Sequence, residues 1–125
     1  MRILAIDDEP CLLRLFPRAL RNHDVVALGP DDALRLLEED RAFDLVLCDL
    51  NLPRANGRWF HDRLLELAAE LADRILFCTG GGCSSEGWQI LEASPERVVY
   101  KPFDGRQLRA AVERFAQRSD PRTPA

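Results

Sequence analysis

The chain has 125 residues, enough for one domain with a single hydrophobic core and too few for two. Its 17 Lys and Arg against 21 Asp and Glu give a net charge of -4, which argues against direct binding of nucleic acid or of a membrane surface. The first residues lack the apolar core of a signal peptide, and no apolar run approaches the roughly 20 residues of a membrane helix. The sequence therefore predicts a cytoplasmic protein.

The first half of the chain alternates short apolar runs with amphipathic stretches. Residues 2–7, 23–28 and 43–50 predict strands, and the last of these is apolar almost throughout, as in a strand covered on both faces. Residues 10–22 predict an amphipathic helix, in which Pro17 should bend or weaken the turn at a cost of about 3 kcal/mol. A loop and cap at residues 29–32 lead into a second helix that ends near Asp40.

The second half continues the alternation. We expect a helix from about Arg58, strands at 74–79 and 97–101, a weakly marked short helix over 84–93, and a final helix over 104–117. Residues 1–118 should form the domain, and residues 119–125 a flexible tail or linker stub.

Alternating strands and helices predict an α/β fold with a parallel sheet and helices on both faces. We expect a doubly wound, flavodoxin-like sheet of five strands in the order 2-1-3-4-5, with five helices. In such sheets, ligands bind beyond the carboxyl ends of the strands. The polar residues expected at that edge are Asp7, Asp8, Asp49, Thr79 and Lys101.

Three carboxylates at one edge would repel one another without a cation between them, and oxygen ligands with room for water suit Mg²⁺. A carboxylate beside such an ion can act as a nucleophile toward a phosphoryl group, while a lysine and a hydroxyl hold the other phosphoryl oxygens. Each aspartate alone could simply cap the next helix, but this explanation is much weaker for all five polar residues together.

The motifs that follow the predicted strands resemble those of the response-regulator receiver family over almost the whole chain. They are Ile6-Asp7-Asp8-Glu9, Asp49-Leu50-Asn51-Leu52-Pro53 with Gly57, Thr79-Gly80, and Lys101-Pro102-Phe103. The Thr-Gly-Gly run and the segment around Lys101 are most similar to receivers attached to hybrid sensor histidine kinases.

The resemblance implies a role for each matching residue. Asp49 would be the phosphoacceptor, and Thr79 and Lys101 would contact the phosphoryl group. Mg²⁺ would be bound by Asp8, by Asp49 and by the backbone carbonyl of Asn51, with Asp7 holding a metal-bound water. The family also implies a cis peptide bond before Pro102.

Four further positions bear on the switch and on the lifetime of the phosphoryl group. The aromatic switch residue usually stands three positions before the lysine, where this chain has Val98, and Tyr100 could replace it in part because alternation along a strand directs both to the same side. Asn51 and Gly81 would flank the path of the water that removes the phosphoryl group, and we expect the missing side chain at Gly81 to leave that path open.

The function predicted is phosphorelay signalling. A sensor histidine kinase or a histidine phosphotransfer protein would donate to Asp49, and an unknown output partner would read the new conformation on the face of the fourth helix, fifth strand and fifth helix. The chain would not be an enzyme beyond its own phosphorylation and dephosphorylation.

Two alternative functions belong to other classes of protein. A magnesium-dependent phosphohydrolase with an aspartyl nucleophile would want a second carboxylate two residues after Asp49, where Asn51 stands. A nucleotide- or flavin-binding module would want a glycine-rich loop after the first strand, which the sequence lacks.

The four cysteines, Cys11, Cys48, Cys78 and Cys83, form no C-x-x-C pair and no Cys/His cluster. We expect reduced, inert thiols. A redox role is the weaker alternative, since Cys48 and Cys78 each precede a predicted site residue.

Overall fold

The computed structural model describes residues 1–49, 62–64, 66–67, 69–79, 97–101 and 104–119. Its elements, in chain order, are β1 (Arg2–Ile6), α1 (Pro10–Ala19), β2 (Asp24–Leu28), α2 (Pro30–Glu39), β3 (Leu45–Asp49), α4 (Ala69–Ala72), β4 (Ile75–Thr79), β5 (Val98–Tyr100) and α6 (Gly105–Ser119). Residues 62–64 and 66–67 are also helical. The predicted helix over 84–93 lies outside the described residues.

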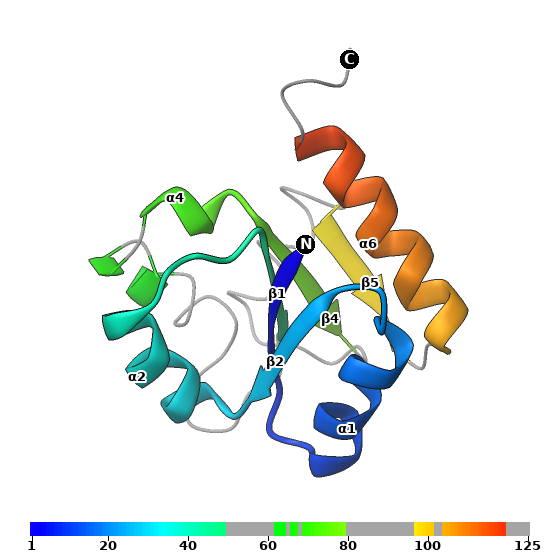
Figure 1. Ribbon diagram of the computed structural model, residues 1–125, viewed down its shortest axis with the longest axis horizontal. Coiled ribbons are helices and arrows are strands. Elements are labelled where there is room, and N and C mark those ends of the chain that lie inside the picture. The colour runs from blue at the N-terminus through cyan, green and yellow to red at the C-terminus, as the bar shows by residue number, and fades with distance from the viewer. Residues whose placement is uncertain (50–61, 65, 68, 80–96, 102–103, 120–125) are drawn as a thin grey trace.

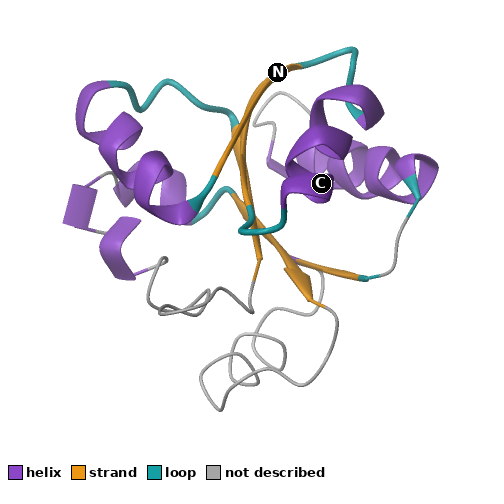
Figure 2. Cartoon of the chain, turned by 90° about the horizontal axis from the view of Figure 1, so that it is seen from below, coloured by secondary structure: helices purple, strands orange, loops and turns teal. Residues whose placement is uncertain are grey.

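All five strands run parallel in one sheet with the order β2-β1-β3-β4-β5, which confirms the predicted flavodoxin-like topology. Figure 1 shows the sheet between two layers of helices. Figure 2 views the molecule from below, with α2 and α4 on one side of the sheet and α1 and α6 on the other. The fold is therefore doubly wound.

The two faces of the sheet bury separate apolar clusters. Alternate residues of β1, β3 and β4 point to opposite faces, so Leu4 packs with α2 while its neighbour Ile3 packs with α1 and α6. Phe77 belongs to the cluster on the α2 side and Phe16 to the cluster on the side of α1 and α6, and both side chains are almost fully buried. Every residue of β3 and β4 is buried, and for β3 the near-continuous apolar run over 43–50 predicted this.

The proline inside α1 does not end the helix. Pro17 is exposed, the helix continues to Ala19, and the Leu20 amide still donates to the Phe16 carbonyl at 3.0 Å. A proline lacks only its own N–H, so near the helix end the bonds of the following residues can form. The predicted end at residue 22 was three residues too late.

No helix of the described residues is long and apolar enough to cross a membrane.

Candidate functional site

The predicted acidic residues meet at the carboxyl edge of the sheet. Asp49 is the last residue of β3, and Asp7 and Asp8 directly follow β1, its neighbour in the sheet. One carboxylate oxygen from each of the three lies within 4.8 Å of the others. Asp7 and Asp49 are buried, with 1% and 4% of their surface exposed, whereas Asp8 is exposed. The sheet topology thus places two carboxylates inside the protein and one at its surface.

Asp7 is held from three directions. Its amide donates to the Leu28 carbonyl at 3.2 Å, its Oδ1 accepts from the Glu9 amide at 3.0 Å, and its Oδ2 accepts from Lys101 Nζ at 3.1 Å. Burial raises the pKa of Asp7, the Glu9 hydrogen bond opposes this, and the Asp49 carboxylate raises the pKa further. Lys101 also lowers the pKa of Asp7, but the net shift is upward, chiefly because the carboxyl group is buried.

Lys101 is the cation of this edge. Its amide donates to the Thr79 carbonyl at 2.7 Å, and its Nζ lies 3.1 Å from Asp7 Oδ2 and 3.4 Å from Asp49 Oδ2. Burial lowers the pKa of Lys101, but the hydrogen bond to Asp7 and the charge of Asp49 outweigh it, so the pKa rises. The side chain is therefore a fixed positive charge beside the Asp49 carboxylate.

Thr79 ends β4 and is fully buried. Its strand is the neighbour of β3, and its register partner in β5 is Tyr100, next to Lys101. The hydroxyl-bearing residue and the lysine are thus brought to the edge where Asp49 lies.

The donor set fits a hard divalent cation. Among the described residues of this edge, three carboxylates and one ammonium leave an excess of negative charge, the candidate ligand atoms are carboxylate oxygens, and the exposure of Asp8 leaves room for water. Mg²⁺ is usually bound by one or two carboxylates and keeps several of its waters. This part of the chain could therefore hold a metal ion.

The predicted switch positions lie at the β5 side of the sheet. Val98 packs against the cluster under α2, whereas Tyr100 is 62% exposed. Tyr100, Gln107 and Arg114 border a cavity of about 330 Å³ between β5 and α6. Asn51, Gly81 and Pro102 lie outside the described residues.

Sequence reasoning missed two contributors. The Glu9 amide orients Asp7, and the thiol of Cys48 donates to the Asp49 carbonyl at 3.5 Å. In an Asx-turn, an aspartate side chain accepts a hydrogen bond from the main-chain amide two residues later, and this common pattern would have revealed the role of Glu9. The contact of Cys48 has no such local signal.

The burial of Cys48 and Cys78 is consistent with the prediction that these thiols are inert. Burial raises the pKa of Cys48 well above its usual value and that of Cys78 to about 12. A thiol that does not ionise is a poor nucleophile. Cys11 is exposed, and Cys83 lies outside the described residues.

Comparison with known proteins identifies the family. The sequence model of the response regulator receiver domain matches residues 3–113. The chain is 29% identical to sensor protein GacS of Pseudomonas syringae over 89% of its own length and 13% of that protein. It is 33% identical to DNA-binding response regulator MtrA of Mycolicibacterium smegmatis over 95% of its own length and 52% of that protein. The chain thus spans about half or less of these curated relatives.

Solved structures agree with the fold. A crystal structure of a response regulator receiver protein from Sinorhizobium medicae superposes with a TM-score of 0.72 at 24% identity, covering 93% of this chain and 94% of that one. Receiver domains of two-component systems accept phosphoryl groups on an aspartate and act in signalling. This chain belongs to the response regulator receiver domain family.

Proposed function

We propose that Asp49 is the phosphoacceptor of this receiver domain. The supporting observation is its surroundings: a buried carboxylate, 3.4 Å from the Lys101 ammonium and within 4.8 Å of two further carboxylates. A buried nucleophile beside one fixed cation and a negatively charged pocket suits transfer of a phosphoryl group in the presence of a metal ion.

The transfer itself is a displacement at phosphorus. A carboxylate oxygen of Asp49 forms the new P–O bond, the P–N bond to the donor imidazole breaks, and the imidazole keeps the bonding electron pair. Lys101 stabilises the phosphoryl oxygens by charge, and Thr79 by its hydroxyl. A separate displacement ends the signal: a water oxygen attacks phosphorus, the P–O bond to Asp49 breaks, Asp49 keeps the bonding electron pair as its carboxylate, and inorganic phosphate leaves while the water's proton passes to solvent.

Asp8, Asp49 and the backbone carbonyl of Asn51 would bind Mg²⁺, with Asp7 holding a metal-bound water. When bound, the ion screens the charge that develops on the phosphoryl oxygens. Asp7 is already oriented for its part, because the Glu9 amide and Lys101 fix its two oxygens.

The donor would be a sensor histidine kinase or a histidine phosphotransfer protein, and GacS, one of the relatives, carries the name of a sensor protein. The output surface would be the side of β5 and α6, because Lys101 directly follows β5 and connects the acceptor to it. The domain would comprise residues 1–118, slightly more than the family match. The phosphohydrolase alternative gains no support, since the family is a signalling family.

Treatment with acetyl phosphate and Mg²⁺ tests the proposal. The wild-type chain should gain the mass of one phosphoryl group, and Asp49→Asn should gain none because the amide is not a nucleophile. Asp31→Asn, an exposed aspartate on α2, is the matched control and should react like wild type. Intact-mass spectrometry provides the measurement, and phosphorylation of Asp49→Asn would refute the assignment.

A further inference from the structure

The charges of the chain are divided between the two sides of the sheet. On the side of α1 and α6, residues 10–22 and 104–117 contain six arginines against two acids. On the side of α2 and α4, residues 30–44 and 62–74 contain ten acids against four arginines. A chain with a net charge of only -4 therefore carries two faces of opposite sign.

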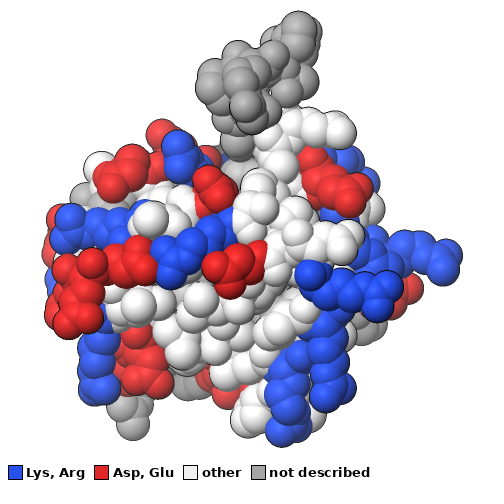
Figure 3. Space-filling view, in the orientation of Figure 1, with Lys and Arg blue, Asp and Glu red and all other residues white. Residues whose placement is uncertain are grey.

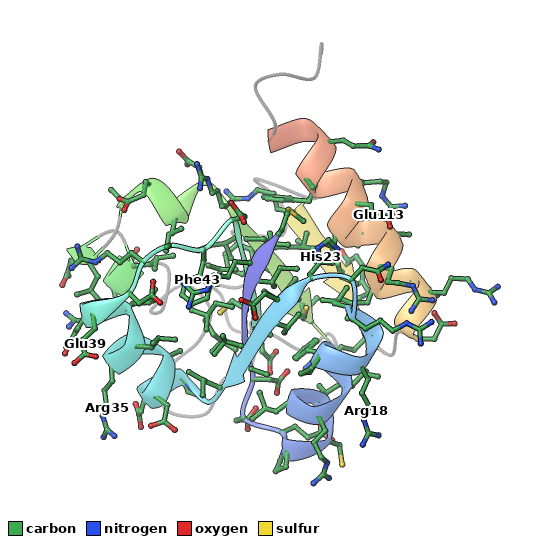
Figure 4. The ribbon with its side chains drawn as sticks, in the orientation of Figure 1. Arg18, His23, Arg35, Glu39, Phe43 and Glu113 are labelled. Carbon is green, nitrogen blue, oxygen red and sulfur yellow. The ribbon has the colours of Figure 1, made fainter. Side chains whose placement is uncertain are left out.

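The basic face consists of Arg14, Arg18, Arg21 and, on α6, Arg106. Arg14 and Arg18 are four residues apart on α1, so they project together from the helix, on the side opposite the buried Phe16, and Arg21 is exposed in the turn that follows the helix. Figure 3 shows the blue side chains gathered over α1 and the first turns of α6, and Figure 4 shows Arg18 directed away from the protein.

These arginines carry charge that the chain does not neutralise. All four are exposed, and none forms an ion pair with any residue that the structure describes. Two of the four arginines on the other side are ion-paired, Arg35 with Asp32 at 3.5 Å and Arg63 with Glu66 at 2.6 Å. The other two, Arg41 and Arg74, donate to main-chain carbonyls.

The acidic face lies on the opposite side of the sheet. It consists of Asp31, Glu38 and Glu39 on α2 with Glu70 and Asp73. All five are exposed, and in the described part of the chain none is ion-paired. Figure 4 shows Glu39 on the side of the molecule away from Arg18.

We infer that the basic face of one chain docks on the acidic face of a second copy. The two faces have opposite charge, similar numbers of unpaired groups, and positions on opposite sides of one rigid sheet, so a single chain cannot bring them together. An interface between two different patches is heterologous, and such contacts continue from copy to copy unless the geometry closes a ring. Exposed ion pairs contribute little each, so the association is weak, reversible and sensitive to salt.

Sedimentation of the purified chain tests this inference. At about 1 mM protein and about 10 mM salt, where the Debye length is near 30 Å, the average mass should rise steadily with concentration above the 14.2 kDa of the monomer. At about 1 M salt it should return to the monomer. A monomer under both conditions, or a dimer that stays at high salt, would overturn the inference.

Substitutions that reverse the charge of two residues on one face test whether the basic face and the acidic face form the contact. The basic-face variant Arg18→Glu with Arg21→Glu and the acidic-face variant Glu38→Lys with Glu39→Lys should each remain monomeric, since each substitution cancels most of the charge on one face. The altered basic face keeps two positive groups beside two negative ones, and the altered acidic face keeps three negative groups beside two positive ones. An equal mixture of the two variants should associate again. Failure of the mixture to associate would contradict the pairing of these faces even where both variants are folded.

A matched single substitution separates this interface from a general effect of net charge. Arg18→Glu and Arg114→Glu change the net charge equally, but Arg114 borders the cavity between β5 and α6 instead of the basic face. Arg18→Glu should weaken association about threefold or more and Arg114→Glu should weaken it less than twofold. The opposite order would assign the contact to the β5 side of α6.

Discussion

At both edges of the sheet several carboxylates surround one cationic side chain. At the amino edge, the guanidinium of Arg2 donates to the two oxygens of Asp40 at 2.9 and 2.7 Å and to the Ala42 carbonyl at 3.1 Å, and it lies 4.3 Å from the centre of the Phe43 ring. The Arg2 amide donates to Asp44 at 2.8 Å. The main-chain amide, Nη1 and Nη2 of Arg2 thus each have an acceptor, Nε lies 3.9 Å from Asp24 Oδ2, and the planar guanidinium matches the geometry of the Asp40 carboxylate.

At the carboxyl edge, one cationic group is shared between two carboxylates instead of being paired with one. The single Lys101 ammonium is shared by Asp7 and Asp49, and Asp8 remains exposed beside them. The effect on pKa differs accordingly: the Arg2 and Ala42 hydrogen bonds lower the pKa of Asp40 to about 2, whereas burial raises that of Asp7. At the amino edge the cation has a bidentate carboxylate partner that stabilises the fold, whereas at the carboxyl edge two buried carboxylates share one ammonium and could accept a further cation.

The largest effect that distinguishes the two edges of the sheet is expected for Asp8→Ala, at the carboxyl edge. The substitution should lower the affinity for Mg²⁺ about tenfold or more, because it removes an exposed ligand without disturbing the core. Titration calorimetry provides the affinity, and Asp31→Ala serves as a control at an exposed aspartate far from the edge. Equal affinity of Asp8→Ala and wild type would remove Asp8 from the metal site.

Arg2→Ala should have the complementary effect. It leaves Asp40 without its guanidinium partner and exposes the Phe43 ring, so the midpoint of thermal unfolding should fall by a few degrees while Mg²⁺ affinity stays unchanged. Arg63→Ala, which breaks an exposed pair with Glu66, should barely change the midpoint. A loss of Mg²⁺ binding in Arg2→Ala would show that the two edges are coupled.

The pH dependence of stability should come partly from the amino edge. The pKa of Asp40 is about 2 in the folded chain against an ordinary 3.8, so its contribution is present above pH 4 and is lost as the pH falls from about 4 to 2. Urea unfolding of wild type and Asp40→Asn over this range measures the contribution. The variant should show a shallower loss, and parallel curves would mean that Asp40 does not contribute.

The smallest effect is expected at Tyr100. Because its ring is 62% exposed, Tyr100→Ala should leave the unfolding midpoint nearly unchanged and should not slow phosphorylation by acetyl phosphate. If the ring takes part in signal readout, binding of the phosphorylated chain to its output partner should weaken. A slower phosphorylation rate would place Tyr100 in the acceptor site instead.

The sequence predicted the carboxyl edge better than the amino edge. Asp7, Asp49, Thr79 and Lys101 each directly follow or end an apolar run, so a parallel sheet must bring them to one edge. Arg2 gave no such signal, because its partners at positions 24, 40 and 43 come from three separate segments and only the folded chain brings them together.

Boundaries were predicted to within one or two residues at most strands, since apolar runs end where the sheet ends. The last strand is shorter than predicted, Val98–Tyr100 instead of 97–101, because only these three residues pair with β4. The opposite charges of the two faces were present in the sequence but emerged only when the helices were assigned to sides of the sheet.

The distance in sequence between Asp7 and Lys101 has a consequence for biosynthesis. The ion pair at 3.1 Å joins residues 94 positions apart, and β5 pairs only with β4 among the described strands. A chain still emerging from the ribosome can form β1, β2 and β3 while the lysine has not yet been made. Incomplete or truncated chains therefore contain Asp49, the proposed acceptor, without the ammonium of Lys101, and only the finished domain contains both groups of the proposed site.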